Sequence, residues 1–284
     1  MVKGEACVDD SKNFGLYAEL IAEEFAKQRG IPTAHYDLVK FINEEGILTY
    51  GVLSESVVDL EKGEVLRSLR SFIGDEEDNG FGEGYDNITS LDYVLDTLPD
   101  VLYDSGYDDE QVGMILTDLQ KRFIDGLETV HTDNHTENIA FIEWMENGKK
   151  KIRLAPQFDC ESTFLLDINE ETLNKLLEDY VGFRDSVDIA DPRIGTVESK
   201  KVGGYESLWK DSLIELCFDE TVRDYFDDCR DMPVDMDAVF EAVEKRIGTS
   251  LPDVVKTVSR TAYSIRRDAM DRAIASSSVR VTCR

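Results

Sequence analysis

Apolar residues near the N-terminus recur at helical spacing and then give way to strand-like runs. Between residues 11 and 29 they fall every three or four positions, and Gly30 follows directly, so the pattern predicts an amphipathic helix that ends at Gly30. Residues 33–42 and 47–53 are rich in β-prone side chains and flank a short polar turn, which predicts an antiparallel hairpin. A helix followed by a hairpin indicates a small N-terminal α+β lobe.

The stretch 74–87 interrupts this pattern with the sequence GDEEDNGFGEGYDN. It is acidic, rich in glycine and without an apolar period on which a packed element could form, so we expect a connecting loop. Its alternating glycines do not indicate a phosphate cradle, because the acidic flanks would repel phosphate and no strand-to-helix context surrounds them. We therefore expect an N-terminal lobe at residues 1–73, a connection at 74–90 and a C-terminal lobe at 91–284.

Helical periodicity dominates the rest of the chain. Helices are predicted at 91–98 and 109–127. A second hairpin is predicted at 139–145 and 151–154, because the Asn-Gly pair between these runs favours a tight type I′ turn. Beyond it, the same apolar period predicts helices at 169–180, 205–217, 221–229, 236–247 and 254–274. The expected fold is therefore α+β, with a small, reduced N-terminal α/β lobe and a larger, mainly helical C-terminal lobe.

Charge narrows the classes of partner. The 284 residues include 60 acidic and 31 basic side chains, a net charge of −29 that repels nucleic-acid phosphates and anionic membranes. We therefore expect no direct nucleic-acid or membrane binding, and a partner selected by charge should be basic. The chain contains no apolar run of about 18 residues and no signal-like N-terminus, so we expect a cytoplasmic protein. Its five cysteines lack a C-x-x-C pair and are expected to be reduced thiols.

Residues with chemical potential gather between 131 and 159. His131, Asp133 and Asn138 form an H-x-D-x-x-x-x-N pattern, and Asp159 follows at the far end of the second hairpin. Phosphoryl transfer needs a carboxylate that orients or deprotonates the acceptor hydroxyl, and oxygen ligands that hold Mg²⁺. We therefore expect Asp133 to be the catalytic base and Asn138 and Asp159 to be metal ligands, with His131 holding the turn.

The same stretch resembles the catalytic segment of protein kinases, and more closely that of the HipA-like serine/threonine kinase family. Asp133-Asn-His135-Thr-Glu-Asn138 is similar to the family's D-R-H-x-x-N, and the sequence LAPQFD at 154–159 is similar to its L-x-P-x-Y-D. The resemblance implies a protein-kinase-like bilobal fold, ATP and Mg²⁺ as cofactors, and a protein serine or threonine as phosphate acceptor.

The N-terminal lobe is similar to that of the family as well. On this comparison Lys3 is the phosphate-binding lysine, Glu19 is its ion-pair partner, His135 lies beside the nucleotide phosphates, and the adenine hinge falls near residues 52–55. The resemblance also implies a toxin or growth-regulatory role and an antitoxin or other regulatory partner. Because Lys3 lies so close to the start of the sequence, the phosphate-gripping loop that the family places upstream is not expected here.

Two other functions fit these residues. The H-x-D-x-x-x-x-N pattern with a following hairpin and aspartate also fits small-molecule kinases of the aminoglycoside or choline type, although His135 and the sequence at 154–159 favour the HipA-like interpretation. The expected absence of the phosphate loop favours a pseudokinase scaffold, which keeps the fold, binds a basic partner through its acidic surface and transfers nothing.

Overall fold

The computed structural model describes residues 2–4, 14–42, 46, 48–74, 91–190 and 209–282. The expected connection at 74–90 lies almost wholly outside the described residues, so the division into two lobes stays a prediction. Within the described ranges, no helix is both long enough and apolar enough to cross a membrane.

The N-terminal part consists of one helix and a three-stranded sheet. Helix α1 (Gly15–Arg29) ends where the sequence predicts, at Gly30, whose φ of 71° is easily adopted by glycine. The predicted start at residue 11 lies outside the described residues. The predicted hairpin is confirmed as β2 (Tyr36–Ile42) and β3 (Leu48–Ser54), and β1 (Val2–Gly4) adds to β3, giving the antiparallel order β1-β3-β2.

A second antiparallel sheet has the order β4-β5-β6. The predicted hairpin is confirmed as β5 (Ala140–Glu146) and β6 (Lys149–Leu154), and its turn residues Asn147 and Gly148 have the positive φ values, 51° and 77°, that a type I′ turn requires. Sequence reasoning missed β4 (Val65–Ser68), because this short strand lacks alternation and pairs with β5 far along the chain.

The remaining described elements are helices. All seven helices predicted after residue 90 are present. One more helix, α6, was missed because it begins where α5 was expected to end. Asp179 caps its N-terminus, since the Asp179 carboxylate accepts a hydrogen bond from the Gly182 N–H. The short helices are η1 (Leu60–Lys62), α2 (Leu69–Ile73) and η2 (Thr163–Leu165). The longer ones are α3 (Leu91–Asp104), α4 (Asp109–Glu128), α5 (Glu170–Glu178), α6 (Tyr180–Ile189), α7 (Trp209–Leu216), α8 (Glu220–Asp231), α9 (Met236–Ile247) and α10 (Asp253–Thr282).

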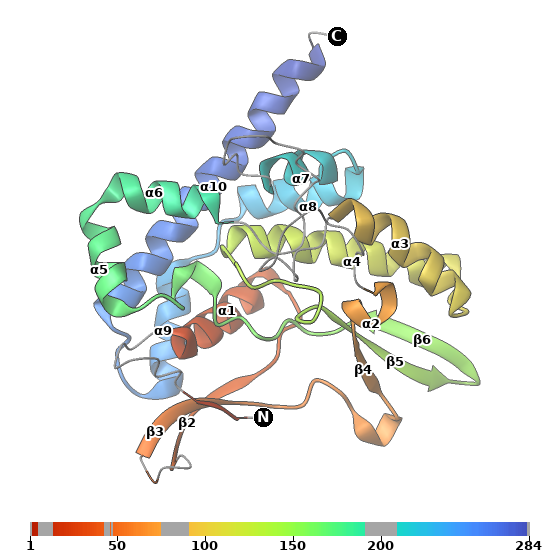
Figure 1. Cartoon of the computed structure of the whole chain (residues 1–284), viewed down its shortest axis with the longest axis horizontal. Coiled ribbons are helices and arrows are strands. Elements are labelled where there is room, and N and C mark those ends of the chain that lie inside the picture. Colours follow the sequence, from red (N-terminus) through yellow and green to blue (C-terminus); the bar gives the residue numbers. More distant parts are fainter. Residues whose placement is uncertain are drawn as a thin grey trace.

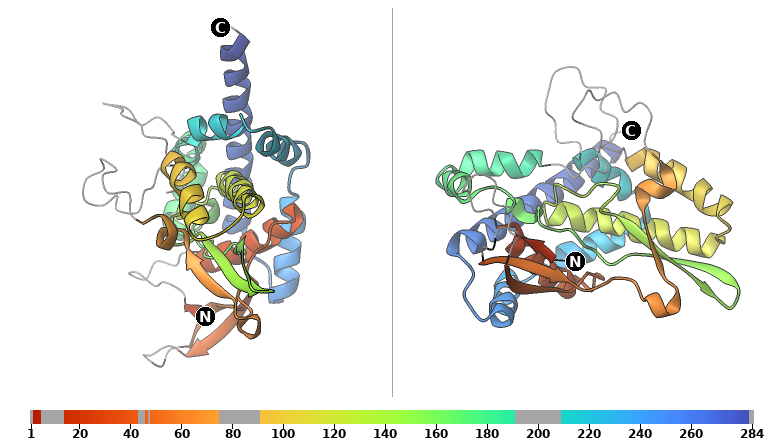
Figure 2. Two further views of the ribbon diagram at one scale, coloured as in Figure 1. Left: turned by 90° about the vertical axis from the view of Figure 1, so that its right-hand side faces the viewer. Right: turned by 60° about the horizontal axis from the view of Figure 1, so that its bottom comes forward.

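Both sheets lie along one side of the molecule, with α3, α4, α7 and α8 on the other side (Figure 1), and the turned views in Figure 2 keep this arrangement. Two large apolar clusters hold it together. One joins α1 and the first sheet to η2, α5, α6, α9 and α10, and the other joins α2, α3 and α4 to the second sheet, α7 and α8. The expected α+β class is confirmed, and the stretch 130–159 contributes to both clusters, Val130 to the first and Ile139, Phe141 and Ile152 to the second.

Candidate active site

The loop after α4 is held in a fixed turn. Val130 has a positive φ of 53°, and the next residue, His131, is buried and donates its backbone N–H to the Gly126 carbonyl oxygen at 2.9 Å. The Ser162 Oγ atom lies 3.0 Å from His131 Nδ1 and accepts the Asp133 N–H at 3.0 Å. His131 therefore holds the turn, and Ser162, which sequence reasoning missed, fastens this loop to the chain just beyond Asp159.

Asp133, His135 and Asn138 come together in this loop. Asn138 Nδ2 donates to the Asp133 carbonyl oxygen at 2.9 Å and to Asp133 Oδ2 at 3.4 Å, and His135 Nε2 lies 3.8 Å from the same Oδ2. Asn138 is buried, whereas the Asp133 side chain is 31% exposed. The Asn138 hydrogen bonds run through its nitrogen, so its amide oxygen is the atom that could take a cation, while the Asp133 carboxylate is open to a substrate.

Asp159 lies in a backbone conformation that two other segments hold in place. Its φ is 60°, and its N–H donates to the hydroxyl oxygen of Tyr36 on β2 at 3.0 Å. The next N–H, of Cys160, donates to Glu19 Oε2 on α1 at 2.8 Å. Tyr36 is buried, and burial together with the nearby Glu19 charge holds the pKa of its hydroxyl far above the ordinary value, so the hydroxyl stays neutral. We call these two contacts the Tyr36–Glu19 clamp.

The strand segment that leads to Asp159 is pinned to the N-terminal part. Thr33 and Gln157 form a parallel bridge, in which the Gln157 N–H donates to the Pro32 carbonyl oxygen at 2.8 Å and the Ala34 N–H donates to the Gln157 carbonyl oxygen at 2.7 Å. The chain therefore enters the clamp from a fixed direction.

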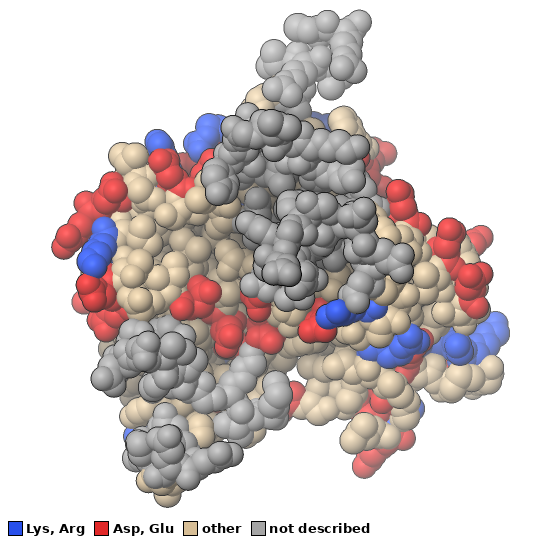
Figure 3. Space-filling model, in the orientation of Figure 1, with Lys and Arg blue, Asp and Glu red and all other residues tan. Residues whose placement is uncertain are grey.

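Carboxylates cluster around Asp159. Oxygen atoms of Glu19, Asp159 and Glu161 all lie within 4.8 Å of one another, although Glu19 is buried and Glu161 is exposed. Asp167 joins the two parts of the site: its pKa is raised to about 6 by desolvation and then by the negative charges of Glu161 and Asp133. Sequence reasoning missed Glu161 and Asp167, because neither belongs to a recognisable motif. The space-filling view shows acidic side chains on the face of the molecule seen in Figure 3.

An apolar cavity of about 390 Å³ opens beside Asp159. It is lined by Tyr36, Val52, Ser54, Glu55, Ser56, Val57, Val58, Leu66, Phe158 and Asp159. The predicted hinge residues 52–55 thus contribute three of the ten lining residues, and Asp159 brings a carboxylate to the same cavity.

The backbone of Lys3 is paired opposite Val52 in the β1–β3 register, which places its strand next to the segment that lines the cavity. The Lys3 side chain is outside the described part of the structure. The predicted ion pair between Lys3 and Glu19 therefore stays a prediction.

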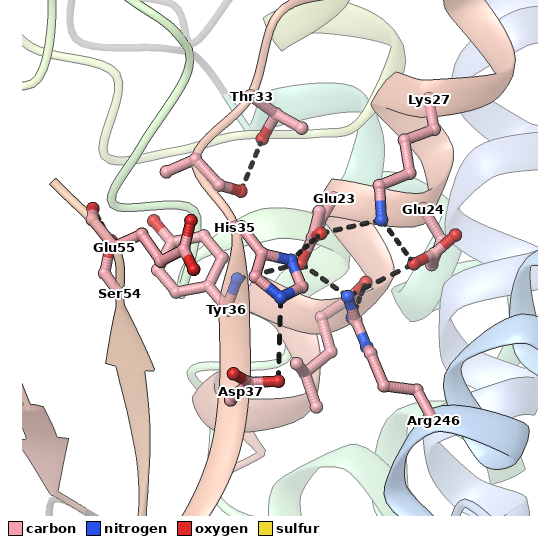
Figure 4. Close-up of polar contacts among 12 residues, drawn as sticks. Glu23, Glu24, Lys27, Thr33, His35, Tyr36, Asp37, Ser54, Glu55 and Arg246 are labelled. Atoms are coloured by element: carbon pink, nitrogen blue, oxygen red, sulfur yellow. Dashed lines mark hydrogen bonds and ion pairs between the residues drawn. The ribbon is translucent and has the colours of Figure 1, made fainter. Parts of the chain in front are cut away.

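A buried carboxylate, Glu23, ties α1 to its neighbours one turn beyond Glu19. Lys27 Nζ, Arg246 Nη1 of α9 and His35 Nδ1 each lie 2.7 Å from a Glu23 oxygen, and the Tyr36 N–H donates to Glu23 Oε2 at 3.0 Å (Figure 4). Burial raises the pKa of Glu23, but the Lys27 and His35 hydrogen bonds and the Arg246 charge outweigh it, so the pKa lies below the ordinary 4.5. The charged network therefore fixes the helix and the strand that form the clamp.

Comparison by sequence finds no matching family model and no matching curated protein. Comparison by structure does find neighbours. The proinflammatory kinase CtkA of Helicobacter pylori matches with a TM-score of 0.60 and 16% identity over 98% of this chain and 91% of CtkA. HipA of Shewanella oneidensis, solved with HipB and operator DNA as a toxin–antitoxin system, matches with a TM-score of 0.50 and 13% identity over 95% of this chain and 57% of HipA.

The fold is that of a HipA-like kinase. The expected resemblance is thereby confirmed at the level of structure, and at such low identity the likeness establishes the fold alone. Within this HipA-like fold, the structure brings Asp133, His135 and Asn138 together in one loop and Glu19 together with Asp159 in the clamp.

Replacing Tyr36 with Phe tests the clamp. The variant leaves the Asp159 N–H without its acceptor, so we expect the free energy of unfolding to fall by about 1–3 kcal/mol, measured by urea denaturation. Tyr50→Phe is the matched control, because Tyr50 lies on the adjacent strand and is 42% exposed, and the expected change is within about 0.5 kcal/mol. Equal losses in the two variants would contradict a specific role for the Tyr36 hydroxyl.

Replacing Glu23 with Gln tests the network behind the clamp. Three cationic or imidazole groups and one backbone N–H would lose a charged acceptor, and we expect a loss of about 2 kcal/mol or more in the free energy of unfolding at neutral pH. Glu24→Gln shares the partners Lys27 and Arg246 but is less buried, and should cost under about 1 kcal/mol.

Low pH should remove the contribution of Glu23 to the free energy of unfolding. Because the pKa of Glu23 is lowered on folding, its contribution is fully present above the ordinary value of 4.5 and is lost as the pH falls through the folded-state value. The stability difference between wild type and Glu23→Gln should therefore shrink in acid. A difference that stays constant or grows as the pH falls below 4.5 would contradict the assignment.

Proposed function

We propose that the chain is an ATP- and Mg²⁺-dependent phosphotransferase, a HipA-like kinase that phosphorylates a serine or threonine of a protein. The observation that carries the proposal is the cavity of about 390 Å³ that has the predicted hinge on its wall and Asp159 at its side. This volume lies within the range of about 300–1,000 Å³ that is typical of small-molecule sites.

The cavity suits the adenine end of a nucleotide. Val52, Val57 and Phe158 offer apolar surface to a flat aromatic ring, and Ser54 and Glu55 place polar residues on the same cavity wall. From there the phosphates would extend toward Asp159. We propose that Lys3, on the strand paired with Val52, binds these phosphates with Glu19 as its partner, and that His135 lies beside them.

The polar residues next to the cavity suit Mg²⁺, which prefers oxygen ligands. Asp159 supplies a carboxylate and Asn138 an amide oxygen, as the sequence predicts, and Glu161 offers a further carboxylate close to Asp159. When bound, Mg²⁺ would neutralise charge on the nucleotide phosphates. The clamp keeps Asp159 in place, because the backbone of Asp159–Cys160 is bonded to β2 and α1.

Asp133 is proposed to act on the acceptor hydroxyl. Its carboxylate would accept the hydroxyl proton as the acceptor oxygen bonds to the γ-phosphorus, the bond from that phosphorus to the β-phosphate oxygen breaks, and ADP leaves. Asn138 and Ser162 hold the backbone of Asp133 through two separate hydrogen bonds, so the base is positioned before substrate arrives.

The charge around Asp133 favours a basic substrate. Glu161 and Asp133 both lie close enough to Asp167 for their negative charges to raise its pKa, and a cationic segment of a protein would relieve that repulsion. HipA is solved together with HipB, and this likeness supports a regulatory partner and a toxin or growth-regulatory role for this chain.

The test is label transfer from γ-labelled ATP with Mg²⁺ to a basic protein substrate. Wild type should transfer label, and Asp133→Asn should lose at least about a hundredfold in rate, since general-base catalysis contributes about 10²–10⁴-fold. Asp159→Asn should also lose most of the transfer rate, because it removes a proposed carboxylate ligand of Mg²⁺ that neutralises charge on the phosphates. Asp96→Asn, at an exposed position on α3, is the control and should match wild type.

Each contrary result has a distinct meaning. Transfer that persists unchanged in both aspartate variants would contradict the assigned site. Nucleotide binding without transfer by wild type would favour the pseudokinase scaffold, and transfer only to small alcohols such as choline or an aminoglycoside would favour the small-molecule kinase.

A further inference from the structure

Strand β2 forms an edge of the first sheet. The sheet has the order β1-β3-β2, so β2 pairs with β3 on one side only. A groove of about 660 Å³ adjoins this strand. It is lined by the middle of β2 at 37–40, by Tyr50 of β3, and by Arg246, Ile247 and Thr249 at and after the end of α9. None of these residues lines the proposed nucleotide cavity.

The direction of the backbone groups along β2 follows from two hydrogen bonds at its start. The carbonyl oxygen of His35 accepts a hydrogen bond from the end of the β3 segment, whereas the Tyr36 N–H donates to Glu23 Oε2 on the side away from β3. Backbone groups alternate in direction along a strand, so the N–H and C=O groups of Leu38 and Lys40 also point away from β3. Among the described residues, these backbone groups have no hydrogen-bond partner.

The groove beside this edge has an apolar floor. Leu38 and Ile247 are both partly buried and both pack against the apolar cluster that contains α1 and α9. Because side chains alternate along a strand, Leu38 shares one face of β2 with Lys40, and Asp37 lies on the other face with Val39. An extended segment placed beside β2 would therefore set every second side chain near Leu38 and Ile247.

The two faces of this edge carry opposite charges. Lys40 is exposed, its Nζ lies 5.1 Å from the centroid of the Tyr50 ring, and it forms no ion pair within the described part of the chain. Asp37 is exposed on the other face, 3.6 Å from His35 Nε2. The nearby Arg246 is already bound to two carboxylates of α1 (Figure 4). Lys40 is therefore the cation that this groove offers to a partner.

We propose that the β2 edge binds an extended segment of a partner protein, which joins the sheet as a further strand. The backbone of the segment would form hydrogen bonds with the outward groups of Leu38 and Lys40. Its side chains on the face of Lys40 would be apolar with one carboxylate, and those on the face of Asp37 would be basic or polar. A second copy of this chain suits the edge less, because two chains with a net charge of −29 repel each other.

Fluorescence polarisation with a labelled peptide of this pattern tests the proposal. The probe has the sequence TVKVTEKV with blocked ends, and it is basic overall, so the acidic protein attracts it. Wild type should bind it. Two further probes carry N-methyl groups at either the odd or the even positions, which removes the N–H groups on one edge of the peptide.

Strand addition uses only one edge of the peptide, so one methylated probe should bind at least about tenfold more weakly and the other within about threefold of the parent. No binding of the parent probe, or equal affinities of the two methylated probes, would overturn the proposal. These measurements do not depend on kinase activity.

Two variants at one position assign the binding to the β2 edge. Lys40→Pro removes an N–H that points away from β3, so the pairing of β2 with β3 is kept. Lys40→Ala keeps that N–H and removes only the charge. We expect Lys40→Ala to weaken binding of the parent probe about two- to threefold and Lys40→Pro at least about tenfold. Equal affinities of the two variants would contradict a backbone contact, and the methylated probes decide the matter on wild type if Lys40→Pro does not fold.

Sedimentation velocity of the chain without peptide tests the other occupant of the edge. We expect wild type and Lys40→Pro to sediment alike. A wild-type dimer that Lys40→Pro converts to a monomer would overturn the proposal, because it would assign the β2 edge to a second copy of the chain.

Discussion

The proposed active site depends on how the backbone at Asp159 and Cys160 is held. Asp159 has a positive φ, which is uncommon outside glycine although aspartate adopts it more readily than most residues. Two backbone N–H groups hold this conformation, one bonded to Tyr36 on β2 and the other to Glu19 on α1. The position of the proposed metal ligand Asp159 is therefore set by the N-terminal helix and sheet, and Glu23 in turn locks that helix to that sheet.

This arrangement joins the two parts of the proposed phosphotransferase site. Ser162, three residues after Asp159, bonds to the loop that carries Asp133, so the proposed base and the proposed metal ligand are fastened to one segment. The same segment packs through η2 into the apolar cluster that contains α1, α9 and α10. Helix α1, Ser162 and the loop of Asp133 are therefore connected through the residues 159–162.

Sequence reasoning succeeded where the signal is local. The turn residues Asn147 and Gly148, the glycine after α1 and the spacing of Asp133 and Asn138 are each encoded within a few residues, and the structure shows the hairpin, the helix end and the compact loop they predict. Tyr36, Ser162 and β4 were missed because their contacts are made across long stretches of chain, 123 residues in the case of Tyr36 and Asp159. Glu19 was selected as a partner of Lys3, and the contact found is with the backbone of Cys160.

The most direct test of the account is a structure of the chain with Mg²⁺ and a non-hydrolysable ATP analogue. The account predicts the adenine ring between Val52 and Phe158, the cation on Asp159 and Asn138, and the γ-phosphate facing Asp133. A nucleotide bound elsewhere, or bound in this cavity with its phosphates directed away from Asp159, would contradict it.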